Sequence, residues 1–388
     1  MAEGAALFPL AVFFFLYFAR SPLFPSGLTA LGCYVSFFLA VALGLKRGWK
    51  RPSFSWSDAV FLLFLLFVVQ GVFASFCFKK SLAYAFKELW IPLVYVLFRL
   101  FYSEEVRGAL YCLLLPVFAV CALSFLLSTS PGDVRGLFSH KNTFGIFSEM
   151  SFLFLLYAAA DVPALFIPCV ASLLMVVLSG CRASIAISVL FGLPALFAHS
   201  PLLRRGLLFS LFLCLFVSLL VPSIRGRFVS LARLRDKSLE DRTVIVKTAF
   251  SLALDRFPWG WGFRRPWRCI CKKNPRIIRS KLPAGRGELV PFMCRGGAHN
   301  LLVELFFEGG ALGLAFGVLL YLYAAVFLVR AFKGGAGTYH LLPFLLLFSL
   351  LTHGLLEVIL YSKRGVLLFS LLAICGNAEK SLSVRRES

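Results

Sequence analysis

His299 and the residues that follow it carry the clearest chemical pattern in the sequence. A helix that begins near His299 would place Asn300, Glu304 and Glu308 on one face, because side chains four residues apart stack on a helix. A neutral imidazole beside this stripe can accept a proton from a hydroxyl group, and a carboxylate can fix its tautomer. We therefore predict that His299 is a catalytic base and that Glu304 orients it. The simpler interpretation is that His299 only caps a helix.

Two arginines could bind a phosphorylated group. Arg182 follows Ser179-Gly180-Cys181 at the end of an apolar run, and Arg242 follows Glu240 and Asp241. A guanidinium donates paired hydrogen bonds to a phosphate, which suits a pyrophosphate leaving group. The simpler interpretations are an interfacial arginine that reaches toward lipid headgroups for Arg182, and a surface ion pair for Arg242.

Further polar and aromatic residues could line a cavity or contact a sugar. They are His140, Lys141, Asn142, Trp259, Trp261 and Asn300. The first three directly precede an apolar run, and the two tryptophans flank a glycine. Tryptophan rings can stack on a sugar, although an aromatic belt at a membrane interface is the alternative for Trp259 and Trp261.

Membrane helices must position these residues, because the chain is too apolar for a water-soluble fold. Of its 388 residues, 60% are hydrophobic and 15% are charged, and the mean hydropathy is +0.87. Soluble domains are about 45–50% apolar and about 25% charged. This composition excludes a soluble enzyme and a disordered chain, and it indicates helices of about 20 apolar residues that span a membrane.

Apolar runs between charges and turn residues predict twelve spans. They lie near residues 5–19, 27–44, 57–77, 82–101, 108–128, 142–160, 162–179, 183–198, 206–222, 309–329, 339–357 and 365–377. We expect an all-α polytopic membrane protein in three parts. Residues 1–222 hold nine helices, 223–300 form one large basic extracytoplasmic loop, and 301–388 hold three helices and a short cytoplasmic tail.

The loop carries much of the formal net charge of +22. Residues 223–300 contain 18 Lys and Arg against five Asp and Glu, a net of +13. Twelve basic residues in the short loops on the side of the termini, against eight on the other side, favour cytoplasmic termini and an extracytoplasmic loop. On that side nucleic acid is excluded as a partner, and anionic lipid or lipid-linked phosphate remains. We expect an amphipathic helix over Asp241–Phe257, and a flexible lid or a lipid-contacting segment over Pro258–Gly297 instead of a packed domain.

Three of the eleven cysteines fall in this loop. We expect free thiols, and the main alternative is a disulfide from Cys269 or Cys271 to Cys294 in an oxidising compartment. The same three thiols and His299 make a nominal zinc set, but Cys-x-Cys with scattered partners is not a common zinc spacing. We expect no metal site and no cofactor.

Four motifs, in order, resemble the O-antigen ligase and polymerase superfamily of bacterial surface polysaccharide assembly. They are Gly136 to Asn142, Ser179-Gly180-Cys181-Arg182, Arg242 followed by Phe257-Pro258-Trp259-Gly260-Trp261-Gly262, and His299-Asn300 with Glu308-Gly309. The resemblance covers roughly residues 130–330. One departure is Cys181, where the family often has a serine.

The resemblance implies a metal-independent, inverting glycosyltransferase of the GT-C type in the bacterial inner membrane, with its active site facing the periplasm. The implied donor is a polysaccharide on undecaprenyl pyrophosphate. His299 corresponds to the family's catalytic histidine, and Arg182 and Arg242 correspond to its phosphate-binding arginines.

Three functions stay open from the sequence. A ligase would use a lipid A-core hydroxyl as acceptor, whereas a polymerase would use a second lipid-linked glycan. A transporter or flippase of lipid-linked glycan would place paired charges near the middle of spans. Its candidates are Glu88, Arg99 and Glu357, and no inverted repeat accompanies them.

Overall fold

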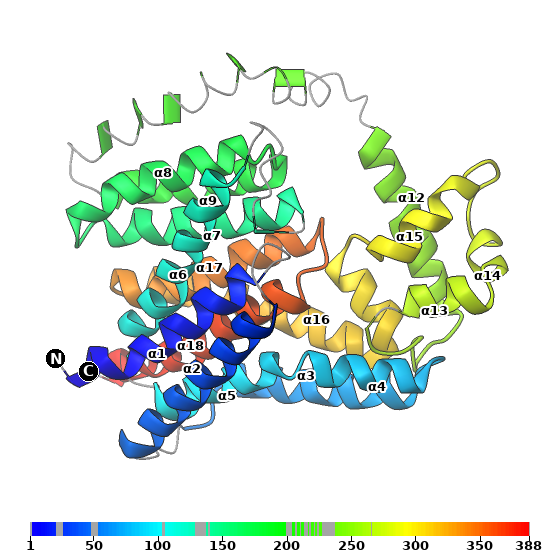
Figure 1. Cartoon of the computed structure of the whole chain (residues 1–388), viewed down its shortest axis with the longest axis horizontal. Helices are drawn as coiled ribbons and strands as arrows, with labels where there is room; N and C mark the ends of the chain where they lie inside the picture. Colours follow the sequence, from blue (N-terminus) through cyan, green and yellow to red (C-terminus); the bar gives the residue numbers. More distant parts are fainter. Residues whose placement is uncertain are drawn as a thin grey trace.

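The computed structural model describes residues 2–20, 26–47, 53–102, 105–128, 137–138, 140–198, 237–264 and 266–387, with scattered residues between 204 and 226. Within these ranges every regular element is a helix, so the all-α prediction is confirmed (Figure 1). The predicted span 206–222 falls largely outside the described residues.

Helices lie at the other predicted spans, within a few residues at most ends. In the first half they are α1 (Ala2–Ala19), α2 (Ser26–Arg47), α3 (Trp56–Phe73), α4 (Phe78–Lys87), α5 (Trp90–Phe101), α6 (Val106–Leu126), α7 (Lys141–Ala158), α8 (Phe166–Leu178) and α9 (Arg182–Ala198). The last three are α16 (Leu301–Lys333), α17 (Thr338–Gly354) and α18 (Ser362–Glu387). Short 3₁₀ helices cover Pro163–Leu165 and Gly287–Leu289.

Five segments of the described chain are long and apolar enough to cross a membrane. They are Thr29–Lys46, Trp56–Phe73, Phe78–Phe101, Val106–Leu126 and Leu301–Lys333. At most 56% of the residues in any of them are buried within the protein, and large apolar side chains such as Leu62 and Leu66 of α3 point outward. Such a surface fits lipid, as expected of a multi-pass membrane protein. The number of twelve spans and the GT-C fold stay predictions.

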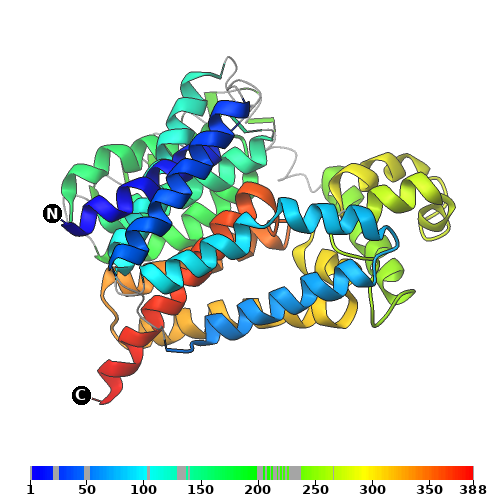
Figure 2. The ribbon, with the colours of Figure 1, turned by 60° about the horizontal axis from the view of Figure 1, so that its bottom comes forward.

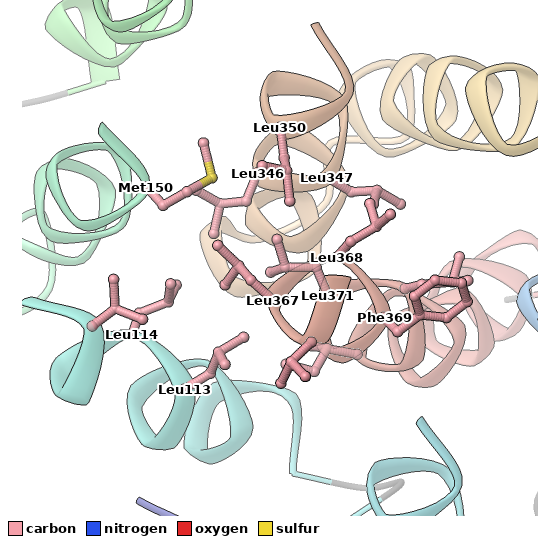
Figure 3. Packing of buried hydrophobic residues seen from close by; sticks show 14 of the residues in the cluster. Leu113, Leu114, Met150, Leu346, Leu347, Leu350, Leu367, Leu368, Phe369 and Leu371 are labelled. Atoms are coloured by element: carbon pink, nitrogen blue, oxygen red, sulfur yellow. The ribbon is translucent and has the colours of Figure 1, made fainter. Parts of the chain in front are cut away.

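α18 is the central helix of the bundle. Every residue from 365 to 378 is buried, as expected for a helix that is apolar all round. Figure 3 shows its leucines packed against three other helices, through Leu113 and Leu114 of α6, Met150 of α7, and Leu346, Leu347 and Leu350 of α17. The buried part of α18 is therefore fixed relative to α6, α7 and α17.

The basic loop folds into four helices with a core of their own. These are α12 (Lys237–Leu254), α13 (Pro266–Lys273), α14 (Arg276–Arg279) and α15 (Val290–Gly296). The helix expected over 241–257 is confirmed as α12. The flexible lid expected over 258–297 is wrong, because its apolar side chains pack together with Ile245 and Phe307 around the buried Trp267, Ile278 and Met293.

The loop and the chain termini lie at opposite ends of the molecule. Figure 1 shows α12 to α15 gathered at the end far from both termini, and Figure 2 shows the same separation after rotation. This arrangement agrees with termini on one side of a membrane and the loop on the other. Which side is cytoplasmic stays a prediction from the charges of the short loops.

A kink in α16 joins the loop to the membrane helices. Gly310 adopts φ 55° and ψ −131°, a left-handed conformation that favours glycine. The segment Pro258–Gly262 lies against the kink: the Pro258 carbonyl accepts from Ala311 N at 2.8 Å, and Trp261 N donates to the Phe307 carbonyl at 2.9 Å. A side chain at Gly310 would collide with the Pro258 backbone, so the absence of a side chain here lets the Pro258 segment pack against the kink.

Candidate active site

The carboxylate of Glu357 is the centre of a polar cluster at the loop end of the bundle. It lies between α17 and α18 and accepts a hydrogen bond from Asn142 Nδ2 at 2.7 Å. Arg242 Nη2 lies 3.3 Å from its Oε1. His299 Nδ1 and Arg364 Nη1 lie 3.9 Å and 3.8 Å from its Oε2. Three residues predicted from the sequence, Asn142, Arg242 and His299, are thus brought together around one carboxylate that was not among the site predictions.

The backbone around His299 aims its ring at this cluster. His299 has φ 54°, in the left-handed region, directly before α16. Asn300 caps the helix, since its Oδ1 accepts from Val303 N at 3.1 Å, and its Nδ2 donates to the Leu355 carbonyl at 3.0 Å. The interpretation of His299 as a helix cap is therefore wrong. Asn300 instead ties the start of α16 to the connection that carries Glu357.

The His299 ring is enclosed but unsatisfied. Its side chain is 12% exposed, and both ring nitrogens are buried without a hydrogen-bond partner among the described residues. The ring stacks on Phe292 of α15, with centroids 5.2 Å apart. A buried polar group without a partner costs about 1–3 kcal/mol, so a native protein that keeps one calls for an explanation such as a catalytic role.

The charges around His299 favour a neutral ring. Burial lowers the pKa of His299 below its usual value, and nearby cations such as Arg242 and Arg364 lower it further, although Glu357 opposes them. Burial alone would raise the pKa of Glu357, but Arg364, His299 and Arg242 outweigh it and hold that pKa below its usual range. At neutral pH the cluster therefore pairs a neutral imidazole with an ionised carboxylate, as a general base requires.

Two guanidinium groups flank the carboxylate. Arg242 comes from α12 and Arg364 from the first turn of α18, and their side chains are 29% and 24% exposed. Arg242 donates to the Leu356 carbonyl and to Glu357, both at 3.3 Å. A guanidinium has five N–H donors. The contacts described for Arg242 use two of them, which leaves donors for an anionic ligand.

The start of α7 borders the same cluster. His140 caps this helix, and its Nδ1 accepts from Asn142 N at 3.3 Å. The charge of His140 also lowers the pKa of His299. Lys141 is half-buried at the first position of α7. The structure thus places two of these three predicted cavity residues in contact with the cluster or within its electrostatic reach.

Arg182 opens α9 next to the same helix. A side chain at Gly145 of α7 would meet Cys181 Cβ at 2.6 Å and Ser184 Oγ at 2.9 Å, so the two helices touch here. Burial raises the pKa of the Cys181 thiol, and the charge of Glu357 adds to the rise. The residue before Arg182 is therefore within electrostatic reach of the cluster.

The carboxylates of α16 face the packed interior. Glu304 is 4% exposed, and its Oε2 accepts from Ala298 N at 2.6 Å and from Trp267 Nε1 at 3.2 Å. Glu308 is fully buried and accepts from the hydroxyl of Tyr361. Glu304 thus holds the backbone one residue before His299. Its predicted effect on His299 would act through that backbone.

The two tryptophans occupy different environments. Trp261 is 6% exposed, and its Nε1 donates to the Leu252 carbonyl at 2.7 Å within the loop core. Trp259 is 64% exposed and lines an open groove of about 610 Å³ with Gln70 and Arg256. The position of Trp261 does not support its predicted sugar contact, because the indole is packed against protein. Sugar contact by Trp259 stays a prediction.

Comparison with known proteins identifies the segment that carries most of these residues. Residues 167–318 match the family described as O-Antigen ligase. This segment belongs to the O-antigen ligase and polymerase superfamily. No curated protein matches the chain.

The O-antigen ligase segment does not contain the whole cluster. It includes Arg182, Arg242 and His299, whereas Asn142 precedes it and Glu357 and Arg364 follow it. The sequence suggested Glu357 only as a charged residue that a transporter could use, and it did not suggest Arg364 as a site residue. An acidic residue at the end of a span, followed by an arginine at the start of the next span, was the signal that could have found them.

A buried pair lies beneath the cluster and joins the same helices. Glu149 of α7 accepts from Ser349 Oγ of α17 at 2.6 Å and hydrogen-bonds His353 Nε2. Ser184 of α9 lies 3.4 Å from the same nitrogen. The His353 carbonyl accepts from Glu357 N at 2.9 Å. This pair therefore fixes α7 and α9 against the end of α17 from which Glu357 projects.

Cysteine pairing removes the zinc alternative. Cys271 and Cys294 form a disulfide between α13 and α15, while Cys269 is a buried free thiol. Two of the four nominal zinc ligands are consumed in this bond. The alternative of a disulfide to Cys294 is confirmed, with Cys271 as the partner.

Proposed function

We propose that the protein is an O-antigen ligase-type glycosyltransferase of the GT-C type in the bacterial inner membrane. It moves a polysaccharide from undecaprenyl pyrophosphate to a lipid A-core hydroxyl on the periplasmic side, without a metal or cofactor. The family match of residues 167–318 supports this class of enzyme. The observation that carries the site is His299, a buried imidazole without a hydrogen-bond partner in the described part of the chain, held 3.9 Å from the carboxylate of Glu357.

His299 acts as the general base in this proposal. Its Nδ1 faces Glu357, so a proton on Nδ1 leaves the lone pair on Nε2. Nε2 takes the proton of the acceptor hydroxyl while that oxygen attacks the anomeric carbon from the face opposite the pyrophosphate, which inverts the configuration. Because Nε2 is buried and Phe292 stacks on the ring, the acceptor must displace Phe292 or its helix to reach it.

The arginines stabilise the departing group. As the bond from the anomeric carbon to the pyrophosphate oxygen breaks, negative charge grows on undecaprenyl pyrophosphate. Arg182 and Arg242 bind that charge, and Arg364 adds a third guanidinium beside Glu357. A pyrophosphate is already a good leaving group, so positioned cations and one base are sufficient for the reaction.

The loop provides a second kind of contact. Five basic residues of α13 and α14 are exposed, namely Arg268, Lys272, Lys273, Arg276 and Arg279. They would lie near anionic lipid headgroups or near the phosphates of a lipid A core. Contact with the phosphates of a lipid A core favours the ligase over a polymerase whose acceptor is another lipid-linked glycan.

The test uses the full chain in detergent with EDTA and undecaprenyl-pyrophosphate-linked glycan. One tube receives lipid A-core and the other no added acceptor. His299→Ala removes the proposed base, and His340→Ala, in the first turn of α17 at the end near the termini, is the matched histidine control.

The proposal expects glycosylated lipid A-core with wild-type protein and His340→Ala, and none with His299→Ala. Ladders of longer lipid-linked glycan without added acceptor would replace the ligase with a polymerase. Transport of lipid-linked glycan across proteoliposome bilayers, without product in either tube, would overturn the enzyme and favour a transporter.

A further inference from the structure

A free thiol on α13 faces a free thiol at the start of α4. Cys269 is 4% exposed on α13, and Cys77 directly precedes α4 with an intermediate exposure. Burial raises the pKa of Cys269 to about 11, and the neighbouring Cys77 thiol adds to the rise. The two thiols therefore lie within electrostatic reach of each other, although 192 positions of chain separate them.

Neighbouring contacts fix this juxtaposition independently. Lys273, one helical turn after Cys269, lies over the ring of Phe76 with Nζ 4.8 Å from its centroid, and Nζ reaches the Phe76 carbonyl at 3.5 Å. Phe76 N also donates to the Trp261 carbonyl at 3.3 Å. In Figure 1, α13 lies beside α4. The α3–α4 turn is thus held against the loop at Phe76, the residue directly before Cys77.

We propose that Cys77 and Cys269 form a second disulfide, which links the loop covalently to the membrane helices. Cys271, two residues from Cys269, is already bonded to Cys294, which agrees with an oxidising compartment. With this bond, all four cysteines of the loop and the adjoining α3–α4 turn are paired. Of the other buried cysteines, Cys112 and Cys375 lie within helices among apolar side chains.

The oxidant in this step is a protein of the same compartment that carries a reactive disulfide. The thiolate of Cys77, the more exposed of the two, attacks one sulfur of that disulfide and forms a mixed disulfide. The Cys269 thiolate then displaces the carrier. Two protons and two electrons leave the Cys77–Cys269 pair, and the carrier disulfide becomes two thiols.

The two disulfides together would link α4 covalently to α15, the helix that packs on the proposed base His299. The route runs from Cys77 to Cys269, along α13 to Cys271, and across the existing bond to Cys294 of α15. Phe292 of that helix stacks on His299. The bond would limit how far α15 can move away from the membrane helices, yet its existence does not depend on glycosyl transfer.

Peptide mapping tests the bond in wild-type protein purified without reductant. Free thiols are alkylated in denaturant with one reagent, and disulfides are then kept intact through trypsin digestion. Cleavage after Arg268 and Lys272 leaves Cys269 and Cys271 on one peptide, and cleavage after Arg286 and Arg295 isolates Cys294. The proposal expects three peptides joined by two disulfides, the third ending at Lys79.

Two joined peptides, with the alkylating reagent on both Cys77 and Cys269, would overturn the proposal. Cys77→Ser gives the second readout. We expect Cys269 to become fully alkylated in this variant while Cys271 and Cys294 stay joined. If Cys269 remained protected in Cys77→Ser, its partner would be another cysteine and the assigned pairing would be wrong. Cys33, buried in α2, serves as the free-thiol control and should be alkylated in every sample.

Discussion

Arginines at the two ends of α18 are held in contrasting ways. Near the termini, Arg99 is 2% exposed, and its Nε and Nη2 donate to Asp58 at 2.9 and 2.6 Å while Nη1 donates to Asn377 at 2.6 Å. At the loop end, Arg364 reaches Glu357 only at 3.8 Å, and Arg242 does so at 3.3 Å. The thirteen residues from Arg364 to Asn377 separate the two clusters by about 20 Å of helix.

The difference indicates which cluster is built for stability and which for a ligand. A buried arginine whose nitrogens all have partners leaves nothing for an added anion to bind. The cluster around Glu357 can still bind an anion. Its contacts are longer, its guanidinium groups are partly exposed, and its imidazole has no hydrogen-bond partner among the described residues. The same distinction argues against transport through Arg99, because its donors are already saturated.

The largest effect should come from His299→Ala. Loss of a general base lowers the rate about 10²–10⁴-fold. The ring makes no hydrogen bond to any residue that the structure describes, so we expect the midpoint of thermal unfolding in detergent to stay close to the wild-type value. Initial rates with saturating donor give the loss of activity, and a melting curve of the same sample gives the midpoint of thermal unfolding. A variant with intact activity would remove His299 from the mechanism.

Arg99→Ala should produce the opposite pattern. Removing one partner of a buried ion pair costs about 3–5 kcal/mol, because Asp58 and Asn377 lose their donors. We expect a much lower midpoint of thermal unfolding and poor yield, with the rate per folded molecule near the wild-type value. A stable Arg99→Ala protein that lacks transfer activity would break the comparison, since it would place a functional group at the end near the termini.

The sequence predicted the residues of the active cluster better than their partners. His299 and Arg242 were predicted because their types and spacing suggest chemistry on their own. Glu357 gains its role only from tertiary contacts with α7, α12 and α18, which no local pattern encodes. The loop was misjudged for a similar reason: its prolines and glycines suggested flexibility, whereas Trp267 and Met293 meet in space to form a core.

Arg242→Ala should weaken use of the donor more than Arg242→Lys does. A hydrogen bond to a charged group contributes about 1.5–3 kcal/mol, so the alanine variant should lose about 10–100-fold in kcat/KM for the lipid-linked donor. Lysine keeps the charge but not the paired donors, and rescue should be partial. Arg330→Ala, exposed in the last turn of α16, is the matched control. Equal kinetics for both Arg242 variants and wild type would exclude a phosphate contact.

Arg364→Gln should shift the pH dependence of transfer. The base must be neutral, so activity falls as the pH drops through the pKa of His299, which burial holds below its usual value and which Arg364 lowers further. Removing that cation raises the pKa, and the acidic limb of the rate profile should move to higher pH by up to about one unit. Arg330→Gln, exposed in the last turn of α16, should leave the limb unchanged. A shift to lower pH would contradict the assigned electrostatics.

The smallest effect should come from Trp259→Ala, and its comparison with Trp261→Ala separates surface contact from packing. Gly260 has φ 77°, which turns the chain between the two rings, so their spacing alone could not reveal that one is exposed and the other buried. If Trp259 stacks on a sugar, the stacking contributes about 0.5–1.5 kcal/mol to binding. Its removal should then raise KM several-fold without lowering the unfolding midpoint. Trp261→Ala should instead destabilise the loop by about 3–5 kcal/mol, because the indole fills the core and bonds to Leu252. An unchanged KM in Trp259→Ala would show that the exposed ring serves only the membrane interface.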